Sequence, residues 1–281
     1  MAVKILIDSA SDINKEQAKE MGVELISMTI NFGEEEFYDG VDLYPEDFYK
    51  KLVNSKDFPR TSQINPFRWE EKFKELTENG DQVVAIVMSS KLSGTYQSAV
   101  LASEKFNGVY VIDSYTVAVG ERILLEYAIS LKNKGLSGKE IADKLEENKN
   151  RVRLYAIVNT LEYLKKGGRI SATVAFAGEL LSIKPVLGVC DGEAKILGKA
   201  MGTKRGNHSL NALVNQAKVD KDMPFGALWS GTDSSLLDKF LADSSTTWKE
   251  DLGEIPRHII GCTIGTHAGP GAFGFAFFAK D

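Results

Sequence analysis

The feature that most constrains the fold is the alternation of short apolar runs with longer helical patterns in the first half of the chain. The run QVVAIV at 82–87 is continuously apolar apart from its first residue, as expected of a strand buried on both faces of a parallel sheet. An amphipathic segment precedes it at 66–80, and a helical pattern follows it at 95–106. Similar apolar runs begin at residues 3 and 109. This rhythm predicts a mostly parallel sheet with helices on both faces.

The pattern changes near residue 150, where adjacent strands replace the alternation. Two apolar runs within 178–200 flank the turn CDGE, which favours a hairpin. The segment 255–281 predicts two further strands joined by a glycine-rich loop. Because 281 residues are enough for two cores, we expect an α/β protein of two domains. Residues 1–150 would form the α/β domain, and residues 151–281 an α+β domain with antiparallel strands.

Composition and charge narrow the class of protein. No apolar stretch reaches transmembrane length, and the start of the chain predicts a first strand and no secretory signal. Cys190 and Cys262 are far apart and form no CxxC pair, which indicates a reduced, cytoplasmic protein. Three scattered histidines and no cysteine cluster disfavour a zinc site, so we expect no metal or cofactor.

The net charge of −5 argues against nucleic acid as the partner. Its distribution is uneven. Residues 1–59 hold 6 Lys or Arg and 13 Asp or Glu, a local net of −7, whereas residues 151–210 hold 10 and 4, a local net of +6. Such a polar molecule could dock a partner electrostatically, or both regions could be solvated surface.

Hydroxyl groups gather in SSKLSGTYQ, residues 89–97, where a predicted strand leads into a helix. This is the edge at which open α/β sheets bind ligands. Ser93 or Thr95 can cap the helix, whose free N–H groups attract an anion, and Gly94 lets a ligand approach the backbone. The sequence contains no P-loop motif, and Lys91 stands where a nucleophile elbow needs glycine. We therefore interpret these hydroxyls as donors to an anion.

Two polar segments of the first half could support the same site. After the first predicted strand, Asp12 is expected to cap a helix starting near Ile13, or Asp8 could support a site. FPRTSQINP at 58–66 is expected to be a rigid loop bracketed by prolines, and it presents Thr61 and Ser62.

Two segments of the second half are further candidates. In LKKGGRIS, a glycine helix end of the Schellman type explains both glycines. Arg169 follows them, either as a surface residue or as a charge that neutralises an anion. IGTHAGPGAFG at 264–274 places Gly265 and His267 in a glycine-rich loop, which indicates a backbone held close to another group.

Seven motifs occur in a fixed order over nearly the whole chain, and they resemble the DegV family. Members of that family include the fatty-acid-binding subunits of bacterial fatty acid kinase. The motifs are DSxxD at Asp8–Asp12, PxTSQ at Pro59–Gln63, SSxLSGTYQS at Ser89–Ser98, DS at Asp113–Ser114, LxxLxKGGRI at Leu161–Ile170, GxLLxIKP at Gly178–Pro185 and IGxHxGPGA at Ile264–Ala272.

The resemblance implies a long-chain fatty acid, such as palmitate, buried between or within two α/β domains. It assigns the carboxylate to Thr61 and Ser93 with His267 nearby, and the acyl pocket to the C-terminal domain. The family's binding subunit does no catalysis and presents the acid to a separate kinase, which makes the acyl phosphate; transient membrane contact is compatible with this role. The predicted ligand-binding residues are Thr61, Ser62, Ser93, Gly94, Thr95, Arg169, Gly265 and His267.

The resemblance leaves one expectation for the acyl tail, one departure from the family pattern and two alternative functions. The apolar segment 170–189 is expected to supply part of the wall for the acyl tail. A basic run like RTRKK, frequent in the family, is replaced at 199–207 by KAMGTKRGN, which bears on the kinase contact and not on ligand binding. The alternatives are a serine hydrolase with Ser93 as nucleophile and His267 as base, and a kinase-related or sugar-phosphate-binding protein without lipid.

Overall fold

The N-terminal half contains the predicted parallel sheet. The computed structural model describes residues 2–170, 183–245, 247–249 and 252–280. All neighbouring strands of this sheet are parallel, in the order β2-β1-β6-β7. Its strands are β1 (Val3–Asp8), β2 (Glu24–Ile26), β6 (Gln82–Val87) and β7 (Val109–Asp113).

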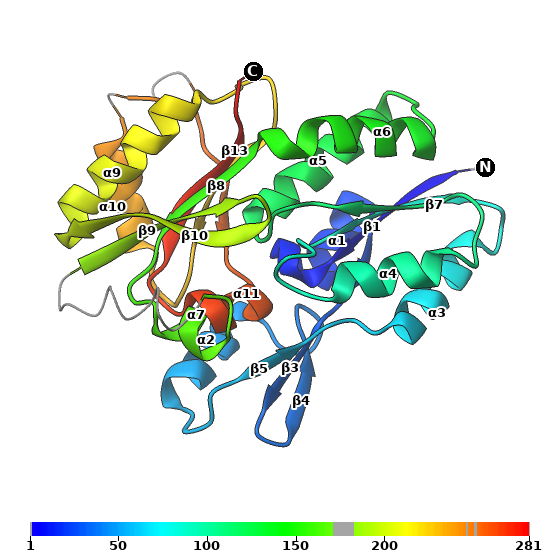
Figure 1. Cartoon of the computed structure of the whole chain (residues 1–281), viewed down its shortest axis with the longest axis horizontal. Coiled ribbons are helices and arrows are strands. Elements are labelled where there is room, and N and C mark those ends of the chain that lie inside the picture. The colour runs from blue at the N-terminus through cyan, green and yellow to red at the C-terminus, as the bar shows by residue number, and fades with distance from the viewer. Residues whose placement is uncertain (1, 171–182, 246, 250–251, 281) are drawn as a thin grey trace.

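Helices cover both faces of the parallel sheet, which confirms the predicted α/β class (Figure 1). Helices α3 and α4 lie below the sheet in that view, and α5 and α6 lie above it. Ser137 and Glu140 form the capping box that starts α6. The helices of this half are α1 (Lys15–Met21), α2 (Pro45–Asn54), α3 (Pro66–Thr77), α4 (Thr95–Ser103), α5 (Val119–Asn133) and α6 (Gly138–Asn148).

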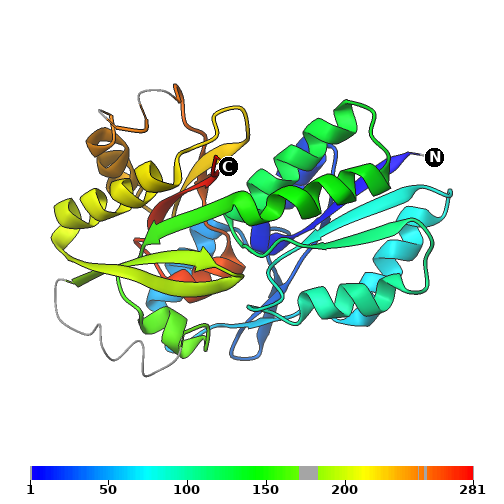
Figure 2. The same cartoon turned by 45° about the horizontal axis from the view of Figure 1, so that its top comes forward.

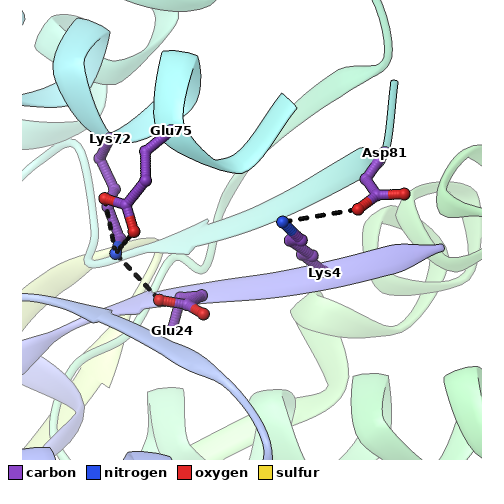
Figure 3. Close-up of polar contacts among 5 residues, drawn as sticks. All are labelled: Lys4, Glu24, Lys72, Glu75 and Asp81. Atoms are coloured by element: carbon purple, nitrogen blue, oxygen red, sulfur yellow. Dashed lines mark hydrogen bonds and ion pairs between the residues drawn. The ribbon is translucent and has the colours of Figure 1, made fainter. Parts of the chain in front are cut away.

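One ion pair joins α3 to β2, the edge strand of this sheet, and two others lie nearby (Figure 3). The Lys72 ammonium lies 2.9 Å from a carboxylate oxygen of Glu24 on β2 and 3.2 Å from one of Glu75 on α3. Lys4 and Asp81 form a second pair, at 3.5 Å. The Lys72 side chain is 18% exposed, and its partners Glu24 and Glu75 are 41% and 63% exposed. Ion pairs with such exposed partners contribute little to stability, so the apolar contacts of α3 dominate its attachment.

A small antiparallel sheet, in the order β4-β3-β5, projects from the N-terminal half (Figure 1). The prediction that 58–66 is only a loop was wrong, because Thr61 pairs with Ile30 of β3 and Ser62 with Thr29. This pairing fixes the backbone of the TSQ motif. The strands are β3 (Thr29–Phe32), β4 (Glu35–Tyr38) and β5 (Arg60–Ser62).

The C-terminal half is built on a six-stranded sheet in the order β10-β9-β8-β13-β11-β12. Neighbours are antiparallel except β11 and β12. The predicted hairpin is confirmed: Asp191 and Gly192 both have positive φ in its turn. The strands are β8 (Val152–Ile157), β9 (Ile183–Cys190), β10 (Glu193–Met201), β11 (Phe225–Trp229), β12 (Arg257–Ile259) and β13 (Phe273–Phe278).

The helices of the C-terminal half include one that the sequence did not predict. Gly265 and His267 lie in helix α11, so the expected glycine-rich loop with histidine was wrong. At Gly265 a Cβ would lie 2.6 Å from the Tyr49 hydroxyl, so this glycine lets α11 pack closely against α2. The helices among the described residues of this half are α7 (Glu162–Lys166), α9 (Gly202–Ala217), α10 (Ser235–Asp243) and α11 (Cys262–Ala268).

The two halves share one apolar core and lie side by side (Figure 2). Val87 and Val119 of the first half belong to the same cluster as Leu154 and Phe278 of the second. The turn of the β9–β10 hairpin also reaches the first half, where the Ser89 hydroxyl donates to the Gly192 carbonyl at 2.7 Å. The domain boundary near residue 150 stays a prediction.

Asp12 does not cap the first helix, contrary to expectation. Asn14 caps α1 in a capping box with Gln17. Asp12 instead takes the left-handed conformation after the short 3-10 turn Ser9–Ser11, and its carboxylate accepts from the Gly261 N–H at 2.8 Å. Asp8 accepts from the N–H groups of Ala10 and Met88, so it holds the ends of β1 and β6 together.

Candidate functional site

An apolar cavity lies between the two halves of the molecule. The volume inside it that the centres of water-sized spheres can occupy is about 110 Å³. Side chains of both halves form its wall, so neither half encloses it alone. Among the apolar residues of the wall are Met28, Met88, Val117, Ala118, Leu154, Leu187, Leu228, Ile260, Ile264 and Ala272.

Five polar side chains also line this cavity: Thr61, Ser93, Arg169, Thr263 and His267. Four of them are among the eight predicted ligand-binding residues, and they come from four separate segments of the chain. The fold therefore brings together the TSQ strand, the SSKLSGTYQ loop, the end of α7 and helix α11. Their role in ligand binding stays a prediction.

Thr61 and His267 contact each other in this lining, and the part of the cavity around them is called its polar end. The Thr61 hydroxyl lies 3.0 Å from Nε2 of His267, within hydrogen-bonding distance. Burial, and then the charge of Arg169, lower the pKa of His267 to about 4, so the imidazole is neutral at neutral pH. At Gly167 a Cβ would lie 2.1 Å from Nδ1 of His267, so a glycine is needed there for the ring to fit.

Ser93 faces the cavity from the loop before α4. Its hydroxyl accepts from the Thr95 N–H at 3.2 Å and lies 2.9 Å from the Thr95 hydroxyl. The expectation that Ser93 or Thr95 is the N-cap was wrong, because Gly94 takes that position. Thr95 is fully buried and its hydroxyl accepts from the Ile64 N–H, so it links α4 to the TSQ segment.

The other predicted residues lie outside the lining of the cavity. Ser62 is exposed on β5, next to Thr61, because successive side chains of a strand point to opposite faces. A Cβ at Gly94 would lie 2.1 Å from the amide oxygen of Gln63. That glycine accommodates a neighbouring side chain, as Gly265 does.

Arg169 links the end of α7 to the Ser93 loop. The Schellman end is confirmed, since the Arg169 N–H donates to the Leu164 carbonyl and Gly168 has φ of +70°. The guanidinium donates from Nε to the Leu92 carbonyl at 3.1 Å and from Nη1 to the Gly167 carbonyl at 2.8 Å. Burial lowers the pKa of Arg169. Its positive charge thus lies beside the polar end.

A second, polar cleft adjoins the same end of the cavity. On the same measure it holds about 820 Å³. Thr61, Arg169 and His267 line both spaces, while Arg60 and Lys166 line only the cleft. The hydroxyl and imidazole groups therefore lie between an apolar interior and a wide polar approach.

The hydrogen bonds of Thr61 and Ser93 bear on the serine hydrolase alternative. His267 contacts Thr61, and Ser93 contacts Thr95. Among the described residues, the hydrogen bond from a serine nucleophile to a histidine base is therefore not formed at this site. This geometry disfavours the serine hydrolase alternative.

Sequence reasoning missed one of the five polar side chains of the lining, Thr263, and most of the apolar lining, including Met28 and Met88. Thr263 precedes His267 by four positions, so both lie on one face of α11; a prediction of helix at 262–268 would have identified it. Met88 directly follows the apolar run 82–87, but nothing in the sequence context of Met28 or Met88 distinguishes them from core. Residues 171–182 of the expected acyl wall lie outside the described residues, whereas Leu187 and Val189 line the cavity.

Two other kinds of feature are not found among the described residues. Within this part of the chain, no group of three or more His, Cys, Asp or Glu side chains is arranged to hold a metal ion. None of its helices has the length and apolar character needed to cross a membrane.

Fold and site together define an α/β protein of three sheets, whose shared apolar cavity is lined by hydroxyl and imidazole groups beside the Arg169 guanidinium. Sequence comparison identifies the particular family. The model described as "Uncharacterised protein, DegV family" matches residues 2–280, so the chain belongs to the DegV family. A DegV domain-containing protein of Caldanaerobacter subterraneus subsp. tengcongensis is 36% identical over 99% of both chains.

Solved structures of the family have the same fold. A fatty-acid-binding DegV family protein of Thermus thermophilus is 30% identical, with a TM-score of 0.88 over 100% of both chains. DegV of Bacillus subtilis, described as a fatty acid binding protein, is 28% identical with a TM-score of 0.84 over 100% of both chains. A stearic-acid-binding protein of Eubacterium ventriosum is 26% identical with a TM-score of 0.85, covering 100% of this chain and 99% of its own.

Proposed function

We propose that this protein binds a long-chain fatty acid, with its tail in the apolar cavity and its carboxylate among Thr61, Ser93 and His267. The observation that carries the proposal is a mainly apolar cavity lined by Thr61, Ser93 and His267, in which the Thr61 hydroxyl lies 3.0 Å from the His267 ring. The fatty-acid-binding relatives support it.

The tail supplies most of the affinity. Burying about 15 methylenes at about 0.8 kcal/mol each gives roughly 12 kcal/mol before the costs of association. Those costs amount to several kcal/mol, which leaves room for sub-micromolar binding. The polar end mainly has to replace the lost hydration of the carboxylate. Hydroxyl and imidazole donors are sufficient for that purpose.

We further propose that the protein is a cytoplasmic carrier that presents the acid to a separate kinase. In that reaction a carboxylate oxygen attacks the γ-phosphorus of the phosphoryl donor, and the bond from this phosphorus to the bridging oxygen breaks. Neutral donors leave the carboxylate nucleophilic, whereas a bidentate arginine clamp would hold it more tightly. The polar cleft beside Thr61 and His267 supports this proposal, because it offers the phosphoryl donor an approach.

Mass spectrometry of an organic extract of the purified protein tests fatty acid binding. We expect a bound acid of roughly 14 to 18 carbons, as the methylene estimate suggests. Delipidated protein should take up added palmitate. If the extract contains no acid and delipidated protein takes up none, the proposal is wrong. Transfer is tested separately, by adding a fatty acid kinase and nucleoside triphosphate and following acyl phosphate formation.

A further inference from the structure

Helix α11, which carries His267, begins without a capping side chain of its own. The residue before it is Gly261. The first N–H groups of the helix are instead bound by a carboxylate from far away in the sequence. Oδ1 of Asp39 accepts from the Cys262 N–H at 3.1 Å, and its Oδ2 accepts from the Thr263 N–H at 2.9 Å.

Asp39 is well placed to act as this remote cap. It is only 2% exposed, and both of its oxygens are used by one helix end. A carboxylate at a helix N-terminus also interacts favourably with the helix dipole. Losing it would leave two buried N–H groups without their acceptors, which is a costly state.

Other groups of the N-terminal half hold the same turn. Asp12 accepts from the Gly261 N–H at 2.8 Å, and the Tyr49 hydroxyl donates to the Ile260 carbonyl at 3.0 Å. The Cys262 thiol lies 3.4 Å from the Leu43 carbonyl oxygen. Of these groups, Asp39 is the one that binds the helical N–H groups themselves.

We propose that Asp39 is a positioning residue for His267: by capping α11 from the N-terminal half, it sets where the imidazole meets Thr61. The helix spans seven residues, or about 10 Å, so a shift at its start is passed to His267 in its last turn. The hydrogen bond between Thr61 and His267 has a narrow distance range. The consequence for the ligand rests on the proposed fatty acid function.

Two variants remove the Asp39 cap to different degrees. Asp39→Asn keeps one acceptor oxygen, whereas Asp39→Ala keeps none. Asn211→Ala is the matched control, because the buried Asn211 also accepts two hydrogen bonds, from Ser244 and Trp248, beside a separate apolar cluster of the C-terminal half. All three variants should lower the melting temperature, but only the Asp39 variants should alter His267.

The first measurement is the proton NMR titration of the His267 ring in protein without ligand, assigned with His267→Gln. Arg169 is the charged group that acts on this ring, and burial keeps the ring neutral. In the wild type, the His267 signals should stay fixed between about pH 8 and pH 5.5. In Asp39→Ala they should titrate, and Asp39→Asn should fall between the two.

The second measurement is palmitate affinity. We expect about tenfold weaker binding in Asp39→Ala, as for the loss of one hydrogen bond to a charged group, and unchanged affinity in Asn211→Ala. Labelling of the Cys262 thiol should be faster in the Asp39 variants, since it is fully buried in the wild type.

The outcomes separate the two proposals. If Asp39→Asn leaves both the His267 titration and the affinity unchanged, the positioning role is refuted, and this variant decides the question if Asp39→Ala does not fold. If the wild type binds no fatty acid, the proposed function fails, while the His267 titration still tests the role of Asp39.

Discussion

Replacing Thr61 by valine removes one hydroxyl and almost no volume, so it isolates the contact between Thr61 and His267. The bond is 3.0 Å long and its histidine is largely buried. A neutral hydrogen bond contributes about 0.5–1.5 kcal/mol, but a buried group left without its partner costs about 1–3 kcal/mol. We therefore expect Thr61→Val to lower the free energy of unfolding by about 1–3 kcal/mol.

The same change should weaken fatty acid binding, because the carboxylate loses one donor. A hydrogen bond to a charged group contributes about 1.5–3 kcal/mol, so the dissociation constant should rise by roughly tenfold to a hundredfold. Displacement of a fluorescent fatty acid, or calorimetry with delipidated protein, measures this constant. Chemical denaturation of the same preparation measures stability.

Ser62→Ala is the matched control for Thr61→Val. Ser62 lies on the same strand, is exposed and does not line the cavity. This variant should keep the wild-type affinity and stability. An unchanged affinity in Thr61→Val, or an equal loss in both variants, would refute the placement of the carboxylate beside Thr61.

Three further predictions concern neighbouring features. Gly167→Ala should displace the His267 ring, since the new Cβ would lie 2.1 Å from Nδ1. It should lower the free energy of unfolding by about 1–3 kcal/mol. Gly198→Ala is its control, because the nearest atom there is 3.9 Å away, and equal losses in both variants would contradict the clash. Because burial lowers the pKa of His267 to about 4, the unfolded state binds more protons, and the wild type should lose stability as the pH falls from about 6.5 towards 4. Urea unfolding of His267→Gln should show a smaller loss over that range, and identical pH dependences would disprove the assignment. Lys72→Met, which removes the two ion pairs of Lys72 drawn in Figure 3 and leaves the pair of Lys4 with Asp81, should change the free energy of unfolding by less than about 1 kcal/mol. A loss of several kcal/mol would show that the Lys72 pairs anchor α3.

Local patterns account for the parts of the fold that sequence reasoning predicted. The strand at 82–87 and the hairpin around CDGE were predicted because an apolar run and a turn motif are each complete within a few residues. Helix α11 was missed for the opposite reason. Its cap, Asp39, lies 223 positions before Cys262 in the sequence, so no local window contains the signal.

The candidate site shows the same difference between signals within one short segment and contacts with distant residues. Thr61, Ser93 and His267 were found through short motifs, and the fold brings all three to one cavity. Gly94 and Gly265 were interpreted as places where a ligand approaches the backbone. They accommodate Gln63 and Tyr49 instead, because a glycine in the sequence does not reveal which neighbour needs the space.

The order of strands in the six-stranded sheet has a consequence for synthesis on the ribosome. Strand β8 must wait for its neighbour β13, which pairs with it from residue 273 onwards. At about 5–20 residues per second, translation of the intervening chain takes on the order of ten seconds. Ile264 and His267 also emerge within that late stretch. The cavity is therefore closed only after β13 has been made, so under the proposed function a fatty acid can be enclosed only after that point.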